Sequence, residues 1–526
     1  MALGAGRGKE QQDTDVLRVQ PSLTEPAAQR WTHFLGGPVA GHGLVGRAVW
    51  ATPLRVLMGL ALGMMSLGWL SKANCLRGDG DGVNWTSNRQ YISGCYADSI
   101  PLYSIEGLKD GHFPYVYSWA GDGGTRHMEY PVLTGLYQWL CAQLAAPLHW
   151  LADLIGWSVP RVDFYFGVNA VFLAIAWIGT LWFTYQLAGH RVWDVILVAA
   201  SPIVGVHIFT NFDSLATVCA MGAIFLWTRK KYAGAGVLIG LGTAAKLWPA
   251  YILGAFLVLV IRHHWRERTE FINTVVSAVV TWLVVNIPIM MASPAGWAEF
   301  FTRNGKRAAE DSTMYSVLSW VTGFSYSTAV PVKAQSIISF VLFGLCCVGI
   351  LILGLKVKRE PAVWELSLLI IAAFVLTSKV WSPQYSLWLV PLVALSLPRW
   401  RLVFAWMWVE AIYWFVRMWW FTGADNKGAP DWLFNSFVIA RDALVVAILV
   451  LVIQQMRGTR PDAPRTMLQA EVPGQQETGV GAWTSHHGVA AQRGASSSEM
   501  SNLTATSRAG TNWTDVGTRS DVGASA

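Results

Sequence analysis

Apolar segments separated by short polar ones run through most of this chain. About twelve of them approach the length of about 20 residues that a helix needs to cross a bilayer. The pattern predicts an all-α polytopic membrane protein with about 12 transmembrane helices within residues 49–456. Residues 1–48 and 457–526 are polar and predict disordered cytoplasmic tails. The apolar segments lie at about residues 50–71, 162–188, 192–209, 213–228, 233–246, 248–261, 271–291, 334–355, 362–378, 385–398, 401–421 and 432–455.

Basic residues gather at alternate connections between these segments. When all the basic connections are placed in the cytoplasm, successive spans alternate without a violation. This orientation leaves residues 72–161 and 292–333 as two large outer loops. It also requires the apolar segment 131–155 to lie along the outer interface as an amphipathic helix, with Gln138, Gln143 and His149 facing water. The basic groups are Arg47, His190–Arg191, Arg229–Lys231, Arg262–Arg268, Lys356–Arg359, Arg399–Arg401 and Arg457–Arg460.

Two apolar hairpins are too short to cross a bilayer twice. Residues 233–261 and 362–398 turn back at polar tips, around Lys246 and around Lys379 to Gln384. Irregular backbone at membrane depth is tolerated only where protein or a water-filled cavity surrounds it. The two hairpins therefore predict a cavity that opens on the outer side.

Composition supports a membrane protein and excludes a nucleic-acid partner. The chain is 53% hydrophobic, only 13% charged and contains 29 tryptophans, a residue that collects at membrane interfaces. The net charge of +7 is spread over loops and tails, so it indicates orientation in the membrane. Of six cysteines, Cys75 and Cys95 lie in the predicted outer loop, where an oxidising compartment favours a disulfide over free thiols. We expect a multi-pass protein of the plasma membrane with lipids as partners.

The outer segment 95–133 is acidic, aromatic and rich in Gly and Pro. Sugar transfer to an alcohol needs a base that takes the acceptor proton, and Asp98 is a carboxylate of the right kind. Asp is also a favoured helix N-cap, and a helix beginning at Ser99 is the alternative explanation for it. From the residue alone both interpretations stand.

A family resemblance extends over about residues 95–420. CYADSIPLYSIEGLKDGHFPY and EYPVLTGLYQWL resemble the first outer loop of actinobacterial glycosyltransferase family 87 proteins. Further matches follow in order: NFDSLAT at 211–217, GLGTAAKLWPA at 240–250, FFTRNGKRAAEDSTMY at 300–315 and SKVWSPQYSLWLVPL at 378–392.

The resemblance implies a GT-C fold with interfacial helices in a large first outer loop. It further implies a polyprenyl-phosphate-linked sugar as donor, mannose by analogy, with Asp98 as the catalytic base. Two departures bear on the acceptor: Ala97 stands where the family has Ser, and SWAGDGGTRH enlarges the loop before Glu129.

Cations are expected around the departing phosphate. Lys246 and Lys379 lie at the hairpin tips, where an ionisable group is costly and usually functional; reaching out to the interface is the alternative. Arg307 suits bidentate phosphate contact, and the resemblance adds Asn304. A merely solvated basic loop is the alternative for Arg307.

The remaining candidates would contact acceptor or sugar hydroxyls. Helix capping is the alternative for Glu129 and Asp213, and surface solvation is the alternative for Arg126 and His127. For Gln384 and Tyr385, the alternative is that they only satisfy the polar groups of a buried turn. No metal-site spacing is present, so neither a metal nor a cofactor is expected. These candidates are Glu129, Tyr103, Arg126, His127, Asp213, Gln384 and Tyr385.

Together these features predict an inverting membrane glycosyltransferase. It would move a sugar from a polyprenyl-phosphate donor to a hydroxyl of a glycolipid or cell-envelope glycan at the outer face. The alternative is a transporter or flippase of lipid-linked sugars, in which the same cations bind phosphate and no bond changes.

Overall fold

The computed structural model describes residues 52–76, 85–121, 124–189 and 191–460. These residues all lie in one compact unit, Met1–Ala470. The tails predicted at 1–48 and beyond 460 lie outside the described residues, so their disorder stays a prediction. Residues 77–84, which include Asn84, also lie outside the described residues.

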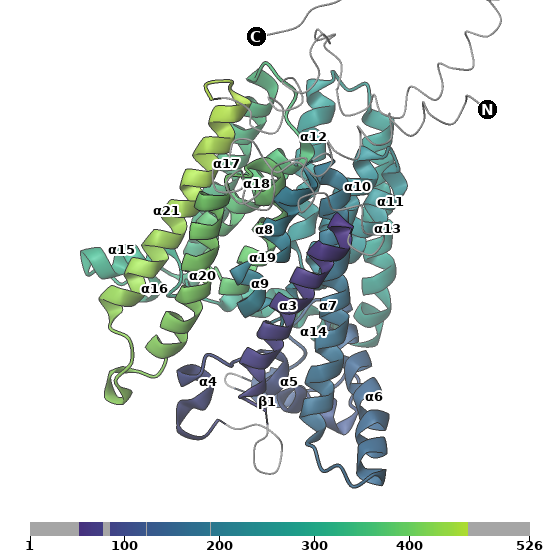
Figure 1. Cartoon of the computed structure of the whole chain (residues 1–526), viewed down its shortest axis with the longest axis vertical. Helices are drawn as coiled ribbons and strands as arrows, with labels where there is room; N and C mark the ends of the chain where they lie inside the picture. Colours follow the sequence, from purple (N-terminus) through teal and green to yellow (C-terminus); the bar gives the residue numbers. More distant parts are fainter. Residues whose placement is uncertain (1–51, 77–84, 122–123, 190, 461–526) are drawn as a thin grey trace, which may run out of the picture. The chain divides into compact units, whose positions relative to one another are not determined.

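Helices make up nearly all regular structure in the described part of the chain, which confirms the all-α prediction (Figure 1). Five of them are long and apolar enough to cross a membrane. The count of about 12 spans is not confirmed and stays a prediction. The five are α3 (Pro53–Ala73), α7 (Arg161–Ala188), α13 (Arg268–Ala292), α17 (Val332–Lys356) and α21 (Asp431–Met456).

Other helices, all but α20 of 16 residues or fewer, form most of the remaining apolar segments. They comprise η3 (Val192–Val195), α8 (Ile196–Ala199), α9 (Pro202–His207), α10 (Asp213–Thr228), α11 (Tyr232–Ala245), η4 (Trp248–Tyr251), α12 (Ile252–Arg262), α18 (Val363–Thr377), η5 (Pro383–Tyr385), α19 (Ser386–Ser396) and α20 (Trp400–Trp420).

The two predicted outer loops are also structured. The first holds η1 (Thr86–Asn88), α4 (Arg89–Ile92), α5 (Ser99–Ile105), η2 (Leu108–Asp110), β1 (Trp119–Gly121), β2 (Gly124–Arg126) and α6 (Val132–Leu154). The second holds α14 (Pro294–Lys306), α15 (Met314–Thr322) and α16 (Tyr326–Ala329), and η6 (Ala424–Asn426) joins α20 to α21. β1 and β2 pair antiparallel, with Trp119 opposite Arg126, so the enlarged part of the first loop folds into a small hairpin.

The two short hairpins are as compact as their sequence predicts. α11 has 14 residues and α18 has 15. At 1.5 Å per residue each is about 21–23 Å long, short of the roughly 30 Å hydrocarbon core. The turns that carry Lys246 and Lys379 therefore lie well inside the length covered by the long helices.

Contacts between distant segments divide the connections into two ends. At one end, Arg262 donates to the Gly354 and Val357 carbonyls, and Trp400 donates to Asp194. At the other end lie α4, α5 and β1, together with the start of α7 (Figure 1). The basic connections thus gather at one end and the two large loops at the other.

α6 packs antiparallel along the first half of α7. The Tyr137 hydroxyl donates to the Asn169 carbonyl, and the His149 ring meets Phe164. Gln138 is fully buried in this contact, so the prediction that it faces water is wrong. The helix uses that face for packing because α7 and the tip of α11 cover it, and leucines such as Leu144 and Leu151 are exposed instead. Its interfacial placement stays a prediction.

Candidate active site

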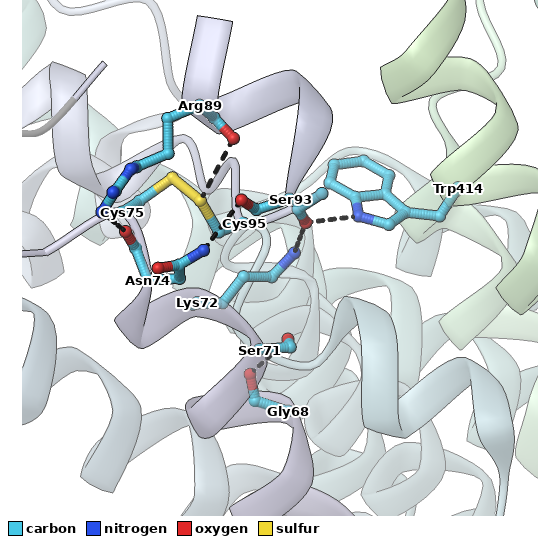
Figure 2. Close-up of a disulfide and its surroundings, with 10 residues drawn as sticks. Gly68, Ser71, Lys72, Asn74, Cys75, Arg89, Ser93, Cys95 and Trp414 are labelled. Carbon is cyan, nitrogen blue, oxygen red and sulfur yellow. Dashed lines mark hydrogen bonds between the residues drawn. A yellow bond between two sulfur atoms is a disulfide. The ribbon is translucent and has the colours of Figure 1, made fainter. Parts of the chain in front are cut away.

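The segment that carries Asp98 is fastened to the end of α3. Cys75, just after α3, forms a disulfide with Cys95, and their Cα atoms are 5.5 Å apart. The Gly94 carbonyl accepts from Trp414 Nε1 at 2.8 Å and from Lys72 Nζ at 3.4 Å. Figure 2 shows both side chains directed to this carbonyl, Lys72 from α3 and Trp414 from α20. Four residues before Asp98, the backbone is therefore held from two helices.

Asp98 occupies the N-cap position of α5, but its side chain does not cap the helix. Instead, Asn211 Nδ2 donates to Asp98 Oδ2 at 2.5 Å, and the Asp98 backbone N–H donates to the Thr210 carbonyl at 2.8 Å. Burial raises the pKa of the Asp98 carboxyl above its ordinary value, while hydrogen bonds from Asn211 and Tyr96 act in the opposite direction. The carboxylate is thus oriented by side chains and left able to accept a proton.

Asn211 joins Asp98 to the loop before α6. Its amide also donates to the Tyr130 hydroxyl at 3.0 Å, and its own carbonyl oxygen accepts from the Phe212 N–H. The Tyr130 ring packs edge-on against Phe212. A neutral amide therefore fixes the distance between the α5 start, the α10 start and the acidic Glu129 loop.

Lys246 and Asp213 form a buried ion pair at the next position along the site. Lys246 Nζ lies 2.6 Å from Asp213 Oδ1, which also accepts from Trp388 Nε1 at 2.6 Å. The second oxygen, Oδ2, is buried and has no hydrogen-bond partner among the described residues. Lys246 also lies over the Tyr385 ring, 5.1 Å from its centre. The pair leaves one carboxylate oxygen available for a substrate hydroxyl.

A second cationic group comes from the end of α14 and the α18–α19 turn. Arg307 forms an ion pair with Glu310, whose backbone N–H donates to the Lys379 carbonyl at 2.9 Å. Lys379 Nζ donates to the neutral Ser336 hydroxyl at 2.8 Å. Burial, and then the nearby Arg307 guanidinium, lower the pKa of Lys379. Arg307 and Lys379 therefore lie near each other, and we call these two residues with Glu310 the cationic corner.

The acidic loop before α6 is cross-linked to α14. Glu129 pairs with Arg303 at 2.6 Å and with Arg126 at 3.5 Å. Arg126 in turn pairs with Glu299 at 2.6 Å. These bonds hold the first and second outer loops together, and they place Glu129 between the Asp98 group and the Arg307 group.

Four other predicted residues are placed differently. Tyr103 stacks on Tyr165, on the side of α5 that faces a groove beside α6 and α7. His127 meets the Tyr117 carbonyl, and exposed Asn304 donates to the Phe300 carbonyl of its own helix. Gln384 is buried in the turn before α19. No contact joins Tyr103, His127 or Asn304 to Asp98 within the described part of the chain.

The fold thus brings together residues that lie far apart in the sequence. Contacts link Asp98 through Asn211 and Tyr130 to the Glu129 loop. Asp213, the first residue of α10, pairs with Lys246 at the end of α11. Sequence reasoning did not select four members of this network. All four lie in or beside segments that carry the family resemblance, which is the signal that could have found them: Asn211, Tyr130, Glu310 and Trp388.

The arrangement combines one proton acceptor with several cations. A partly buried carboxylate with raised pKa is a suitable acceptor for the proton of a hydroxyl. Preorganised cations in a partly dry site stabilise charge that develops on a leaving oxygen. In the described residues no group of three or more His, Cys, Asp or Glu side chains is arranged to hold a metal ion.

Comparison with known proteins narrows the chemistry. A search of curated proteins gave no match. Residues 136–383, just under half of the chain, match the profile of Glycosyltransferase family 87. The matched range contains Asp213, Lys246, Arg307 and Lys379, whereas Asp98 precedes it. The match indicates a glycosyltransferase of the GT-C type and does not favour a transporter.

Proposed function

We propose that this protein is an inverting membrane glycosyltransferase. It moves a sugar, mannose by family resemblance, from a polyprenyl-phosphate donor to a hydroxyl of a glycolipid or cell-envelope glycan. The reaction takes place at the outer face of the plasma membrane. The observation that supports this most directly is the Asp98 carboxylate oriented by Asn211, which stands two residues before the Asp213 that pairs with Lys246.

Asp98 acts as the base in this proposal. Its carboxylate takes the proton of the acceptor hydroxyl while the hydroxyl oxygen attacks the anomeric carbon. The attack comes from the face opposite the bond to phosphate, so the configuration inverts. Asn211 keeps the carboxylate in position, and the unpartnered Asp213 Oδ2 accepts a hydrogen bond from a sugar hydroxyl.

The cations receive the departing phosphate. Lys379 has a neutral partner, so its charge is available to the phosphate without breaking an ion pair. Lys246 and Arg307 each have a carboxylate partner and must exchange or share it when the phosphate arrives. The lipid tail of the donor remains in the bilayer, beside the apolar outer surfaces of α13 and α17.

A flippase would need polar groups along a path to the opposite end of the molecule. The ionisable residues assigned to the proposed site lie instead in or beside the two large loops and the two hairpin turns. This grouping favours bond transfer at one surface over transport.

The test is replacement of Asp98 by Asn. We expect Asp98→Asn to lower the rate of mannose transfer from radiolabelled polyprenyl-phosphate-mannose by about 100-fold to 10,000-fold, the usual contribution of a general base. Binding of the labelled donor should persist. Asp110→Asn, an exposed carboxylate of the same loop, is the matched control and should transfer at the wild-type rate. Transfer by Asp98→Asn near the wild-type rate would remove Asp98 from this role.

A further inference from the structure

A second pocket lies between the α15–α16 segment and the turn that joins α20 to α21. Its volume is about 320 Å³, within the range of small-ligand sites. It contains none of the residues assigned to the transfer site. Its lining residues are Ala309, Asp311, Tyr315, Ser316, Ser319, Trp320, Gly323, Ser325, Tyr326, Ser327, Trp420, Asp431, Phe434 and Asn435.

Aromatic rings form much of the wall. Tyr315 stacks on Tyr326 at 4.8 Å, and Trp420 stacks on Phe434 at 4.6 Å. Trp320 is 45% exposed, so part of its ring surface is open to a ligand. The C–H faces of a sugar ring are apolar and pack well against such rings, while hydroxyls at its edge still need polar partners.

Two buried polar atoms of the pocket residues lack partners. The Tyr326 hydroxyl and the Asn435 side-chain oxygen have no hydrogen-bond partner among the described residues. Tyr326 is 8% exposed and Asn435 is 5% exposed. Buried polar groups are nearly always hydrogen-bonded, so these two atoms indicate a missing partner. A hydroxyl-rich ligand supplies both donors and acceptors.

The charge of the pocket distinguishes it from the transfer site. Asp311 and Asp431 are among its lining residues, which include neither lysine nor arginine within the described chain. One Asp431 oxygen accepts from Trp420 Nε1 at 2.8 Å. Carboxylates accept hydrogen bonds from sugar hydroxyls and repel phosphate. The pocket therefore suits a neutral sugar and not the donor phosphate.

One short segment of the chain contributes residues both to the pocket and to the proposed transfer site. Ala309 and Asp311 line it, while Arg307 and Glu310 of the same short segment belong to the cationic corner. The Ala309 N–H donates to Gln335 Oε1 and the Ser312 hydroxyl donates to the Trp381 carbonyl, which fixes the segment between the two.

The position also suits a molecule at the membrane surface. α15 lies crosswise to α20 and α21 (Figure 1). Apolar side chains of α15 are exposed, with Leu318 at 52% and Val321 at 67%. An exposed apolar face beside the pocket suits contact with the acyl chains of a glycolipid whose head group enters the pocket.

We propose that this pocket is a sugar-binding subsite that holds a neutral sugar residue of the acceptor glycan, away from the residue that is elongated. The inference rests on the proposed glycosyltransferase function. The sugar belongs either to a glycolipid head group or to a free glycan, because both present the same hydroxyls and C–H faces.

The test measures binding to the full-length protein in lipid nanodiscs. The probes are α-linked mannotriose as the free glycan and its octyl glycoside as the lipid-linked form. Trp320→Ala removes the open ring, and Tyr326→Phe removes only the unpartnered hydroxyl. We expect the dissociation constant to rise about tenfold for the first variant and about fivefold for the second. Preference for the octyl form would assign the subsite to a glycolipid, and equal binding would assign it to a free glycan.

Trp432→Ala is the matched control. Trp432 is 59% exposed near the start of α21 but does not line the pocket, so binding and thermal stability should remain as in the wild type. Inorganic phosphate should not compete with mannotriose. Unchanged binding in both pocket variants, competition by phosphate, or failure of the wild type to bind either probe would overturn the proposal.

The same assay separates this inference from the proposed function. Asp98→Asn should bind mannotriose like the wild type, because the base lies outside the pocket. Loss of binding in Trp320→Ala together with normal transfer by Asp98→Asn would preserve the subsite and reject the catalytic role of Asp98. Normal binding in Trp320→Ala together with an inactive Asp98→Asn would do the reverse.

Discussion

At the scale of single residues, Asp98 is held between two opposing effects. Burial favours its protonated form, whereas the hydrogen bond from Asn211 favours its charged form. Only the charged form can take a proton from the acceptor. Activity should therefore be full above the raised pKa and fall as the pH drops through it. Asn211 sets where that fall occurs.

We predict that Asn211→Ala moves the acid limb of kcat/KM to higher pH. The loss of a hydrogen bond to a charged group, worth about 1.5–3 kcal/mol, corresponds to about one to two pH units. The pH profile of sugar transfer measures this shift. Asn426→Ala removes an amide whose bond to the Thr422 carbonyl lies in the α20–α21 turn, and it should leave the profile unchanged. An acid limb that stays in place in Asn211→Ala would contradict the role of this amide.

Sequence alone selected the charged members of the site better than the neutral ones. The sequence selects Lys246 because an ionisable group is costly near membrane depth, and Asp213 as a group that could hold a sugar hydroxyl. Their mutual ion pair depends on how α10 and α11 pack. Asn211 and Tyr130 carry no charge, so neither cost nor spacing separated them from ordinary polar residues. Tyr103 was chosen for its neighbours in sequence, and one turn of α5 directs it toward Tyr165 instead.

At the scale of elements, the disulfide and Trp414 fix the start of α5. Cys95 lies three residues before Asp98, and its bond to Cys75 closes a loop with a sequence separation of 20. Lys72 lies over the Trp414 ring, 4.4 Å from its centre, and both donate to the Gly94 carbonyl. The disulfide and these hydrogen bonds together limit how far the Asp98 backbone can move from Thr210.

We predict that the double variant Cys75→Ser, Cys95→Ser loses both stability and rate. A loop of this length contributes about 3 kcal/mol in the chain-entropy description, so the temperature of half-inactivation should fall. The kcat should fall as well, because the base is held less firmly. Cys346→Ser changes a free cysteine of α17 and serves as control in both measurements. A double variant with wild-type kcat would show that the bridge stabilises the loop without positioning Asp98.

The element boundaries show what periodicity can and cannot supply. The short hairpins were recognisable because each has too few residues to cross twice, and α11 and α18 have the expected lengths. The buried face of α6 was not recognisable from the sequence, because Gln138 has a polar side chain and is covered only by contact with α7 and α11. The β1–β2 hairpin also escaped prediction, since its strands have three residues each.

At the scale of the whole molecule, two kinds of connection between the helices are separated. The connections rich in Lys and Arg meet at one end, as the contacts of Arg262 and Trp400 show. The acidic and aromatic loops meet at the other end, through the pairs of Glu129 and Arg126 with α14. The positive-inside rule then predicts that the candidate site faces outward.

We predict that single cysteines placed at the two ends react on opposite sides of the membrane. His112→Cys and Asp425→Cys lie in exposed turns at the end of the candidate site, whereas Lys230→Cys and Lys358→Cys lie in exposed basic connections. A membrane-impermeant maleimide applied to intact cells should label the first pair, and should label the second pair only after permeabilisation. Each variant must retain transfer activity, which ensures that the labelled molecule is folded. If His112→Cys and Asp425→Cys react from different sides, the first outer loop and the α20–α21 turn do not share a surface, and the proposed orientation of the chain is wrong.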